Sequence, residues 1–394
     1  MDNLKRQRIA EALADIVRTA RACGPERRIA LMVGGGELGA EELLRGARMA
    51  QEARPGLRVL AIGTPAPGWE DLDWLPCEDS DEARAAALDA AFAEGRIDGA
   101  VALHYPFPIG VTTIGRIQTP GCGRPLFVAS CTGMSHAKRG PALLLNAVYG
   151  LAAAKAAGIA RPSLAFLNQD GAAQALRALQ RMRDAGYDVN FGASGRGDGG
   201  SLLRGNDLVA GTVDVLVCDS LTGNALVKVF ATFTSGGYRE TVGWGYGPSA
   251  GEGWSRVVSI ISRASGAPVA AQALQLAATC SAADLPGIVT RELAAARAAG
   301  LDDALAQLAP PAAPAAATSA PVAPPAVPVD AQITGVDVLD LEPATQALWK
   351  ENIYAENAMG CTGPVIRVQA SLKERAVAIL QREGFLAPSE GEQQ

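Results

Sequence analysis

Cys361 is the residue of this sequence best suited to covalent chemistry, and it lies in the run Glu356-Asn357-Ala358-Met359-Gly360-Cys361-Thr362-Gly363-Pro364. A thiolate can attack a carbonyl carbon and carry an acyl group. Backbone N–H groups beside it can lower the pKa of the thiol and hold an oxyanion. Asn357, Thr362 and Gly363 would contact the substrate. On position alone a buried structural cysteine is the simpler interpretation, since no histidine lies nearby in the sequence to act as a base.

A second candidate is the run Asp219-Ser220-Leu221-Thr222-Gly223-Asn224, which follows an apolar strand at 213–217 and precedes a helix containing Lys228. Hydroxyl and amide donors at a helix start suit a phosphate or a developing oxyanion, and the lysine one turn further adds positive charge. The candidate binding residues are Ser220, Thr222, Gly223 and Asn224. Asp219 would orient a donor or Lys228. An ordinary capped helix explains the run equally well.

The sequence contains two histidines, His104 and His136. His136 follows a strand end in a polar loop, which makes it the better candidate for proton transfer, although a lone histidine is more often structural. His104, beside two prolines, is expected to be a packed loop residue. Arg263, in the run Ser262-Arg263-Ala264-Ser265-Gly266, could hold an anion or form a surface ion pair.

Two glycine-rich runs have alternative interpretations. Residues 34–39 formally contain Gly-x-Gly-x-x-Gly, but the next strand ends in Ile62-Gly63-Thr64-Pro65 without the acidic residue that a ribose needs. A tight strand-to-helix turn is therefore favoured over a dinucleotide site. Residues 236–253 contain seven glycines, and we expect them to form a mobile loop over the substrate, with Trp244 and Tyr246 as its contact surface, or else a plain surface loop.

The elements that must position these residues alternate along the chain. Apolar runs predict strands at 29–33, 59–62, 101–103, 126–129, 164–167 and 213–217. Amphipathic segments predict helices at 41–54, 81–94, 141–157 and 171–185. This alternation predicts an α/β fold with a mostly parallel sheet flanked by helices on both faces. Ligands in such folds bind at the carboxyl ends of the strands, where the polar loops of this chain fall.

Composition divides the chain into three parts. We expect a body at 1–308, which begins with a helix at 3–22, and an uncharged Ala/Pro-rich linker at 309–329. A C-terminal segment at 330–394 would dock on the body. Within that segment we predict a strand at 334–339, a helix at 345–358, a Cys-Thr-Gly-Pro turn, a strand at 365–368 and a helix at 371–383.

Composition also excludes several classes of protein. The 394 residues include 35 Lys and Arg against 41 Asp and Glu, so the net charge of −6 argues against nucleic acid as a partner. Polar residues interrupt the longest apolar run, at 141–157, which argues against a membrane span. Seven scattered cysteines and two histidines predict neither a disulfide framework nor a metal site. With no apolar leader at the amino terminus, we expect a cytoplasmic protein.

The motifs together resemble a known group of enzymes. Residues 215–224 with Lys228 are similar to the Asp-Gly-x-Thr-Gly-Asn motif of the PlsX-type acyl-ACP:phosphate acyltransferases. Residues 36–39, 262–268, the Gly-Tyr-Gly-Pro loop and above all 355–364 more closely resemble the alpha subunit of component C of the glycine, sarcosine and betaine reductases. That resemblance covers nearly the whole chain.

The resemblance implies a phosphate acyltransferase fold and a partner subunit similar to a ketoacyl-ACP synthase of the third type. In that family an acetyl group is held as a cysteine thioester and released to phosphate as acetyl phosphate. Cys361 matches the thioester cysteine, and no cofactor is implied. Ser220 replaces the motif's glycine, and the chain has no selenocysteine, which leaves the acyl group open.

Three alternatives remain open on the sequence. The protein could be a biosynthetic acyltransferase that takes its acyl group from a carrier protein or a coenzyme A thioester. It could be a non-catalytic subunit that stabilises a synthase-like partner. A dinucleotide-dependent oxidoreductase is the third.

Overall fold

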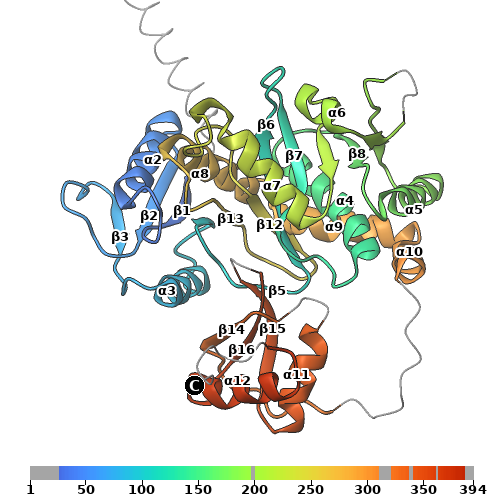
Figure 1. Ribbon diagram of the computed structural model, residues 1–394. Coiled ribbons are helices and arrows are strands. Elements are labelled where there is room, and N and C mark those ends of the chain that lie inside the picture. Colours follow the sequence, from blue (N-terminus) through green and yellow to red (C-terminus); the bar gives the residue numbers. More distant parts are fainter. Residues whose placement is uncertain (1–25, 197–199, 310–320, 337–339, 361–362, 387–394) are drawn as a thin grey trace, which may run out of the picture.

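The computed structural model describes residues 26–196, 200–309, 321–336, 340–360 and 363–386. It shows a large α/β body with a smaller C-terminal domain beneath it (Figure 1). The predicted helix at 3–22 and part of the predicted linker lie outside the described residues. Among the described helices, none is both long and apolar enough to cross a membrane.

The body is built on a twelve-stranded sheet, as counted within the described residues, in the order β10-β8-β11-β7-β6-β12-β13-β4-β1-β2-β3, with β9 beside β8. The strands are β1 (Arg27–Met32), β2 (Leu57–Ile62), β3 (Asp73–Leu75), β4 (Gly99–Ala102), β6 (Val111–Gln118), β7 (Pro125–Gly133), β8 (Ser163–Leu167), β9 (Asn190–Phe191), β10 (Leu202–Leu203), β11 (Val215–Val217), β12 (Gly247–Gly251) and β13 (Val258–Ile260). Every predicted strand of the body corresponds to one of them.

The sheet consists of two parallel wings joined by an antiparallel centre. One wing contains β3, β2, β1, β4 and β13, and the other contains β7, β11, β8, β9 and β10; within each wing every pairing is parallel. β6 and β12 join the wings through antiparallel pairings. The prediction of a mostly parallel α/β sheet is therefore confirmed.

The expectation of a mobile loop at 236–253 is wrong for its second half. Residues 247–251 form β12, which is buried along its whole length between β6 and β13. The glycines there serve close packing, because a Cβ atom on Gly247 would lie 1.8 Å from the carbonyl oxygen of Ile114. Tyr246 is buried, and the ring of Trp244 lies under the guanidinium of Arg116 at 4.4 Å.

Helices cover both faces of the sheet (Figure 1). They are α2 (Ala40–Ala53), α3 (Asp81–Ala93), α4 (Arg139–Ala156), α5 (Ala172–Asp184), α6 (Gly205–Ala210), α7 (Ser220–Ala231), α8 (Ala267–Ala282), α9 (Leu285–Ala298) and α10 (Leu301–Leu308), with a short 3-10 turn, η1 (Phe233–Ser235), after α7. The four helices predicted in the body correspond to α2, α3, α4 and α5.

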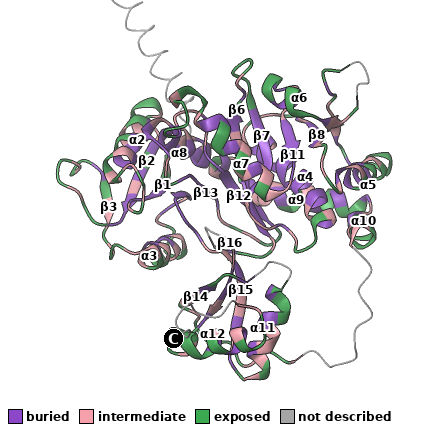
Figure 2. Ribbon diagram, in the orientation of Figure 1, coloured by how far each residue is buried: buried purple, intermediate pink, exposed green. Residues whose placement is uncertain are grey.

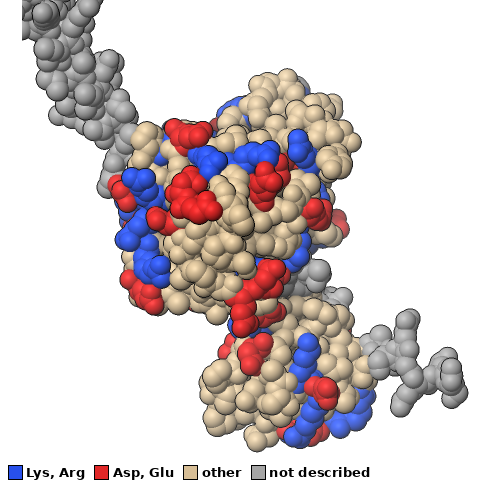
Figure 3. All heavy atoms as spheres, turned by 90° about the vertical axis from the view of Figure 1, so that its left-hand side faces the viewer, with Lys and Arg blue, Asp and Glu red and all other residues tan. Residues whose placement is uncertain are grey.

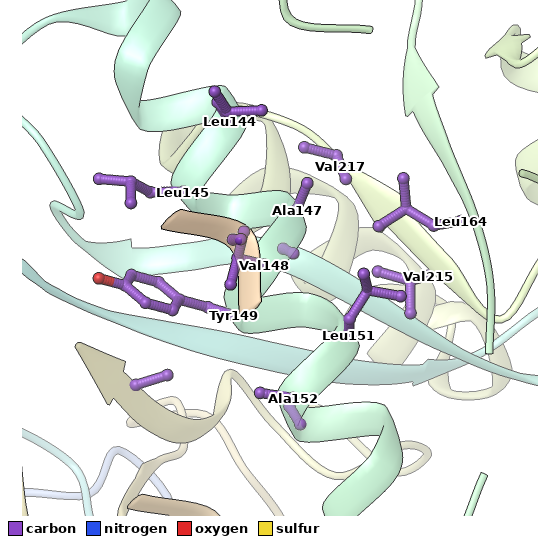
Figure 4. Packing of buried hydrophobic residues seen from close by; sticks show 14 of the residues in the cluster. Leu144, Leu145, Ala147, Val148, Tyr149, Leu151, Ala152, Leu164, Val215 and Val217 are labelled. Atoms are coloured by element: carbon purple, nitrogen blue, oxygen red, sulfur yellow. The ribbon is translucent and has the colours of Figure 1, made fainter. Parts of the chain in front are cut away.

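α4 forms the centre of the largest core. Its Leu144, Val148 and Leu151 lie toward Leu164 of β8 and Val215 of β11 (Figure 4). Each side chain of this size contributes about 1.5–3 kcal/mol when fully buried. Buried residues occupy the strands of the sheet, while exposed residues lie on the outer helix faces and loops (Figure 2).

The C-terminal domain contains a second sheet, in the order β14-β16-β15-β5. Its elements are β14 (Ala331–Thr334), α11 (Leu341–Lys350), β15 (Ala355–Gly360), β16 (Gly363–Val368), η2 (Ala370–Leu372) and α12 (Lys373–Arg382). The edge strand β5 (Phe107–Pro108) comes from the body. The predicted strand at 365–368 and helix at 371–383 correspond to β16 and α12.

Two boundaries in this domain differ from the sequence prediction. The helix expected at 345–358 ends at Lys350, and 355–358 belong to β15. Asn352 takes a left-handed φ of 58°, and the N–H of Ile353 donates to the carbonyl of Leu348 at 3.0 Å, so the helix closes in a Schellman turn. The strand expected at 334–339 is found at 331–334, while 337–339 lie outside the described residues.

Candidate active site

An open pocket of about 250 Å³ lies where the carboxyl ends of the body's strands meet the C-terminal domain. Its lining follows β1, β4, β7, β11 and β13, the edge at which parallel sheets bind ligands. The lining residues are Glu37, Leu103, His104, Tyr105, Phe107, Thr132, Gly133, Asn224, Lys228, Tyr246, Ile260, Ile261, Ser262, Arg263 and Met359. The lining therefore combines cationic side chains and one amide with aromatic and aliphatic side chains.

The Asp219 motif begins helix α7, and its first residues hold the helix in place. Oδ1 of Asp219 accepts from the backbone N–H of Thr222 at 2.9 Å, and Oδ2 accepts from the Thr222 hydroxyl at 2.9 Å. Arg139 also donates to Oδ2, at 3.0 Å. A Cβ atom on Gly223 would lie 1.8 Å from the carbonyl oxygen of Ser130, so this glycine lets α7 pack against β7. The capped-helix interpretation therefore applies to Asp219, Thr222 and Gly223.

Asn224 and Lys228, one turn apart on α7, both line the pocket. The Lys228 side chain is exposed, and its ammonium makes no ion pair or hydrogen bond with another described residue. Ser220 stands one turn before Asn224 but is not part of the lining. The structure thus brings the last residue of the motif and Lys228, rather than the whole motif, to the pocket.

The structure brings His104, rather than His136, to the pocket. His104 follows β4 with only 9% of its surface exposed, and burial lowers the pKa of its imidazole below the usual 6.5. It is therefore neutral at pH 7 and has a basic nitrogen. His136 lies in the loop before α4, where its Nδ1 accepts from the backbone N–H of Lys138 at 2.9 Å. The sequence contained a signal that places His104 at the candidate site, because His104 directly follows a predicted strand.

Arg263 lines the pocket from the turn after β13. The positive charge of its guanidinium is partly neutralised there. Its Nη2 donates to Asp81 Oδ2 at 2.9 Å, and its Nη1 lies 3.4 Å from the carbonyl oxygen of Gly35. Asp81 also accepts from Arg84 at 2.8 Å. The glycine-rich turn at 34–39 packs on this arginine, since the N–H of Glu37 donates to the Arg263 carbonyl at 2.8 Å. This matches the favoured interpretation of a tight strand-to-helix turn.

Glu240 stands behind the Arg263 turn and was not singled out from the sequence. Its side chain is fully buried, and its Oε2 accepts from the Ser265 hydroxyl at 2.8 Å. The backbone N–H of Glu240 donates to the Ala264 carbonyl at 3.0 Å, and Gly266 donates back to the Glu240 carbonyl at 2.9 Å. Burial raises the pKa of this carboxyl above its ordinary value of 4.5, although Lys228 opposes the shift. No pattern in the sequence marks such a residue.

Glu240→Gln is expected to change how stability depends on pH. Because the pKa of Glu240 is raised in the folded state, the folded protein holds the proton of this carboxyl more tightly than the unfolded chain does. The stability contributed by the protonated carboxyl is therefore lost as pH rises through that pKa. As pH rises from 4 to 8, the Tm of the variant should increase relative to that of the wild type. The increase should be about 2 °C for each kcal/mol by which the two free energies of unfolding come to differ. Thermal unfolding across that range measures it. Glu374→Gln, at an exposed position on α12, is the control, and an equal pH trend in both variants would contradict the expectation.

The hairpin that carries the Cys361 motif reaches the pocket through β15. β15 pairs with β5 of the body, Ala358 opposite Pro108 and Met359 opposite Phe107, and Met359 joins the pocket lining. Gly360 and Gly363 form the last pair of the β15–β16 ladder. Cys361 and Thr362 themselves lie outside the described residues. Asn357 is engaged within its own domain, where its Oδ1 accepts from the Thr345 hydroxyl of α11.

Proteins similar to this chain were found by sequence and by structure. The family model described as "Fatty acid synthesis protein" matches residues 27–367. The chain is 42% identical over 375 residues to the "Glycine/sarcosine/betaine reductase complex component C subunit alpha" of Peptoclostridium acidaminophilum, covering 95% of this chain and 96% of that protein.

A more distant relative and one solved structure were also found. A "Phosphate acyltransferase" of Gluconacetobacter diazotrophicus is 26% identical over 234 residues, which is 49% of this chain and 61% of that protein. A branched-chain phosphotransacylase from Enterococcus faecalis V583 aligns with a TM-score of 0.43 at 15% identity, over 64% of this chain and 99% of the other. The family match spans most of the chain, and the 42% identity spans nearly all of it, so this protein belongs to the fatty acid synthesis protein family and is a homologue of the component C alpha subunit.

Proposed function

We propose that this protein accepts an acyl group as a thioester on Cys361 and transfers it to phosphate, with release of an acyl phosphate. The observation that supports this most directly is the arrangement of the pocket. Asn224, Lys228 and Arg263 converge there, and Met359, two residues before Cys361, lines the same pocket.

The proposed reaction has two steps. The Cys361 thiolate attacks the carbonyl carbon of a donor thioester, a tetrahedral oxyanion forms, and the donor thiolate leaves. A phosphate oxygen then attacks the new thioester, and collapse of the second tetrahedral species expels the Cys361 thiolate. The Lys228 ammonium and the Asn224 amide would bind the phosphate, and Arg263 would add positive charge at the mouth.

His104 is the base in this proposal. It lines the same pocket as Met359 and is neutral at pH 7 because burial lowers its pKa. A neutral imidazole can take the proton of the Cys361 thiol, which ordinarily has a pKa near 8.5 and is mostly protonated at neutral pH. The proton would pass to the departing donor thiolate, so that the histidine is neutral again before phosphate reacts.

The acyl group proposed is short. Phe107, Tyr246 and Ile260 are apolar members of the lining, and each is at most 6% exposed. These side chains suit the methyl or short alkyl end of an acyl group. By analogy with the relative from Peptoclostridium acidaminophilum, we propose that the protein works within a multi-subunit complex. The family resemblance of the motifs adds a synthase-like subunit as the partner in that complex.

Acylation followed by phosphate discharge tests the proposal. Purified protein mixed with acetyl-CoA should gain the mass of one acetyl group, and inorganic phosphate should remove it with formation of acetyl phosphate. Lys228→Met should form the same adduct but need roughly tenfold to a hundredfold more phosphate to discharge it, because a charge-assisted contact to an anion contributes about 1.5–3 kcal/mol.

The control is Lys373→Met, which removes an exposed lysine at the start of α12. Intact-protein mass spectrometry follows the adduct, and a coupled assay follows acetyl phosphate. An adduct that water and phosphate discharge at equal rates would refute transfer to phosphate. The absence of any adduct, with acetyl phosphate as the alternative donor and a synthase-like partner present, would favour the stabilising-subunit alternative.

A further inference from the structure

Thr132 lies near the end of β7, where the ladder with β6 is irregular. Between two successive residue pairs of this ladder, β6 contributes one residue, Thr113, whereas β7 contributes three, 130–132. Such a bulge bends its strand and changes the direction in which a side chain points. In this protein the bulge lies beside the pocket, which Thr132 and Gly133 both line.

Two threonines of β6 hold Thr132 in place. The Thr112 hydroxyl donates to the carbonyl oxygen of Thr132 at 2.7 Å. The backbone N–H of Thr132 donates to the Thr113 hydroxyl at 3.2 Å, and the hydroxyl oxygens of Thr113 and Thr132 lie 2.9 Å apart. Thr112 and Thr113 are both fully buried. The backbone and the side chain of Thr132 are therefore both fixed by contacts with β6.

The direction of the hydrogen bond between the two hydroxyls follows from the surroundings of Thr113. A threonine hydroxyl has one hydrogen to donate, and a buried hydroxyl is rarely left without an acceptor. Among the described residues, the only acceptor that the Thr113 hydroxyl meets is Oγ1 of Thr132, since its other partner is an N–H group. Thr113 therefore donates to Thr132, and the hydrogen of the Thr132 hydroxyl must point elsewhere.

The pocket is where that hydrogen can find an acceptor. With Thr113 as the donor, the Thr132 hydroxyl donates to no other residue in the part of the chain that the structure describes. Thr132 is half-buried, and the pocket that it lines lies at the junction of the body and the C-terminal domain, which Figure 3 shows from the side. Because accepting a hydrogen bond polarises a hydroxyl, Thr132 is also a better donor than an isolated threonine.

The start of α7 packs against the same part of β7. A Cβ atom on Gly223 would lie 1.8 Å from the carbonyl oxygen of Ser130, two residues before Thr132. Asn224 follows Gly223 and Lys228 comes one turn later, and both line the pocket together with Thr132. An amide N–H, an ammonium and a hydroxyl can all donate hydrogen bonds. The three groups together suit an anion with several acceptor oxygens.

We infer that the Thr132 hydroxyl donates a hydrogen bond to phosphate bound between the end of β7 and the start of α7, and that Thr113 orients this hydroxyl. The inference rests on the proposed function for the identity of the anion. It adds a neutral donor to the two groups on α7, Asn224 and Lys228. Thr113 is a positioning residue, because it is buried and would act on the anion only through Thr132.

Thr132→Val tests the donor, because it removes the hydroxyl and keeps the shape of the side chain. Inorganic phosphate is the probe, and isothermal titration calorimetry on the full-length protein measures its Kd. We expect the Kd to rise about tenfold, as the loss of a hydrogen bond to a charged group implies. Thr132→Ser keeps the hydroxyl and should bind phosphate within about threefold of the wild type. An unchanged Kd in Thr132→Val, or a loss that Thr132→Ser shares in full, would overturn the inference.

Thr113→Val tests the orienting role. The Thr132 hydroxyl then has no donor to hold it, so the Kd for phosphate should rise, by less than in Thr132→Val. The double variant should bind phosphate no more weakly than Thr132→Val alone, because both changes act through one hydrogen bond. Thr119→Val is the matched control, since Thr119 is buried just after β6, accepts from the N–H of Arg124 at 3.1 Å and does not line the pocket. Additive losses in the double variant, or an equal loss in the control, would overturn the orienting role.

The titration uses no acyl group, so the inference and the proposed transfer can fail separately. A wild type that binds phosphate but forms no acetyl adduct would refute the transfer, while the Kd values of the variants would still decide the inference. A wild type that binds no phosphate would overturn the inference itself. Acylation by acetyl-CoA should proceed equally in the wild type and in Thr132→Val. A loss confined to acylation, with the Kd for phosphate unchanged, would place the hydroxyl on the acyl oxygen and overturn the inference.

Discussion

Replacing Cys361 by serine is expected to lower the rate of acyl phosphate formation at least about 10³-fold, the scale seen when a covalent nucleophile is removed from an enzyme. A serine hydroxyl has almost no ionised fraction at neutral pH, and the ester that it could form is less reactive than a thioester toward phosphate. The measurement is the initial rate of acetyl phosphate formation from acetyl-CoA and phosphate, with thermal unfolding to confirm that the variant is folded.

Cys122 provides the matched control for this prediction. It is exposed, and the hydrogen bond with the Thr119 hydroxyl, at 3.4 Å, lowers the pKa of its thiol. Judged only by how readily its thiol ionises, Cys122 is therefore a reactive cysteine of the body. Cys122→Ser should leave the rate unchanged, because this thiol lies away from the pocket lining. A rate that survives Cys361→Ser would mean that the proposed thioester residue is wrong, and a rate lost with Cys122→Ser would identify its replacement.

Replacing His104 by glutamine is expected to lower the same rate by about 10²–10⁴-fold, the usual contribution of a positioned base. Because burial lowers the pKa of His104, its base form persists below the usual 6.5. The wild-type rate should therefore fall only on an acidic limb with an apparent pKa below 6.5. His104→Gln should remove that limb and leave a rate that rises with pH as the thiol ionises by itself.

His136→Gln is the natural comparison, since the chain contains only these two histidines. The imidazole of His136 accepts from the backbone of Lys138 and does not line the pocket, so its loss should change the rate less than twofold. The pH–rate profile of both variants distinguishes a base from a packing residue. Equal losses, or a His104→Gln profile that keeps its acidic limb, would contradict a role for His104 in proton transfer.

The parallel wings of the sheet could be predicted because their signal is local. β1, β2, β8 and β11 are apolar runs bounded by turn residues, and α2, α4 and α5 are the helices between strands. β6 and β12 could not be recognised in the same way. β12 reads Gly-Pro-Ser-Ala-Gly, and its place in the sheet depends on backbone packing against Ile114 rather than on side-chain hydrophobicity.

The candidate site shows the same division. Lys228, Asn224 and Arg263 were predicted, and they line one pocket because the ends of β11 and β13 meet there. Asp219 and Thr222 were predicted with them, but a capping residue and an anion-binding residue have the same side chains, and only their hydrogen bonds distinguish the two roles. His104 was expected only to be a packed loop residue, and its place in the pocket lining depends on where the end of β4 lies in the sheet.

The sequence by itself determined the α/β class, the order of the predicted strands and helices, and the family, because these depend on periodicity, composition and short motifs within single segments. Only the tertiary structure decided which residues share the pocket and that β15 pairs with β5. Phe107 and Met359 stand more than 250 positions apart, and no local pattern records which sheet edges meet. That choice is made by the packing of whole elements, whose energy is summed over many contacts that are distant in the chain.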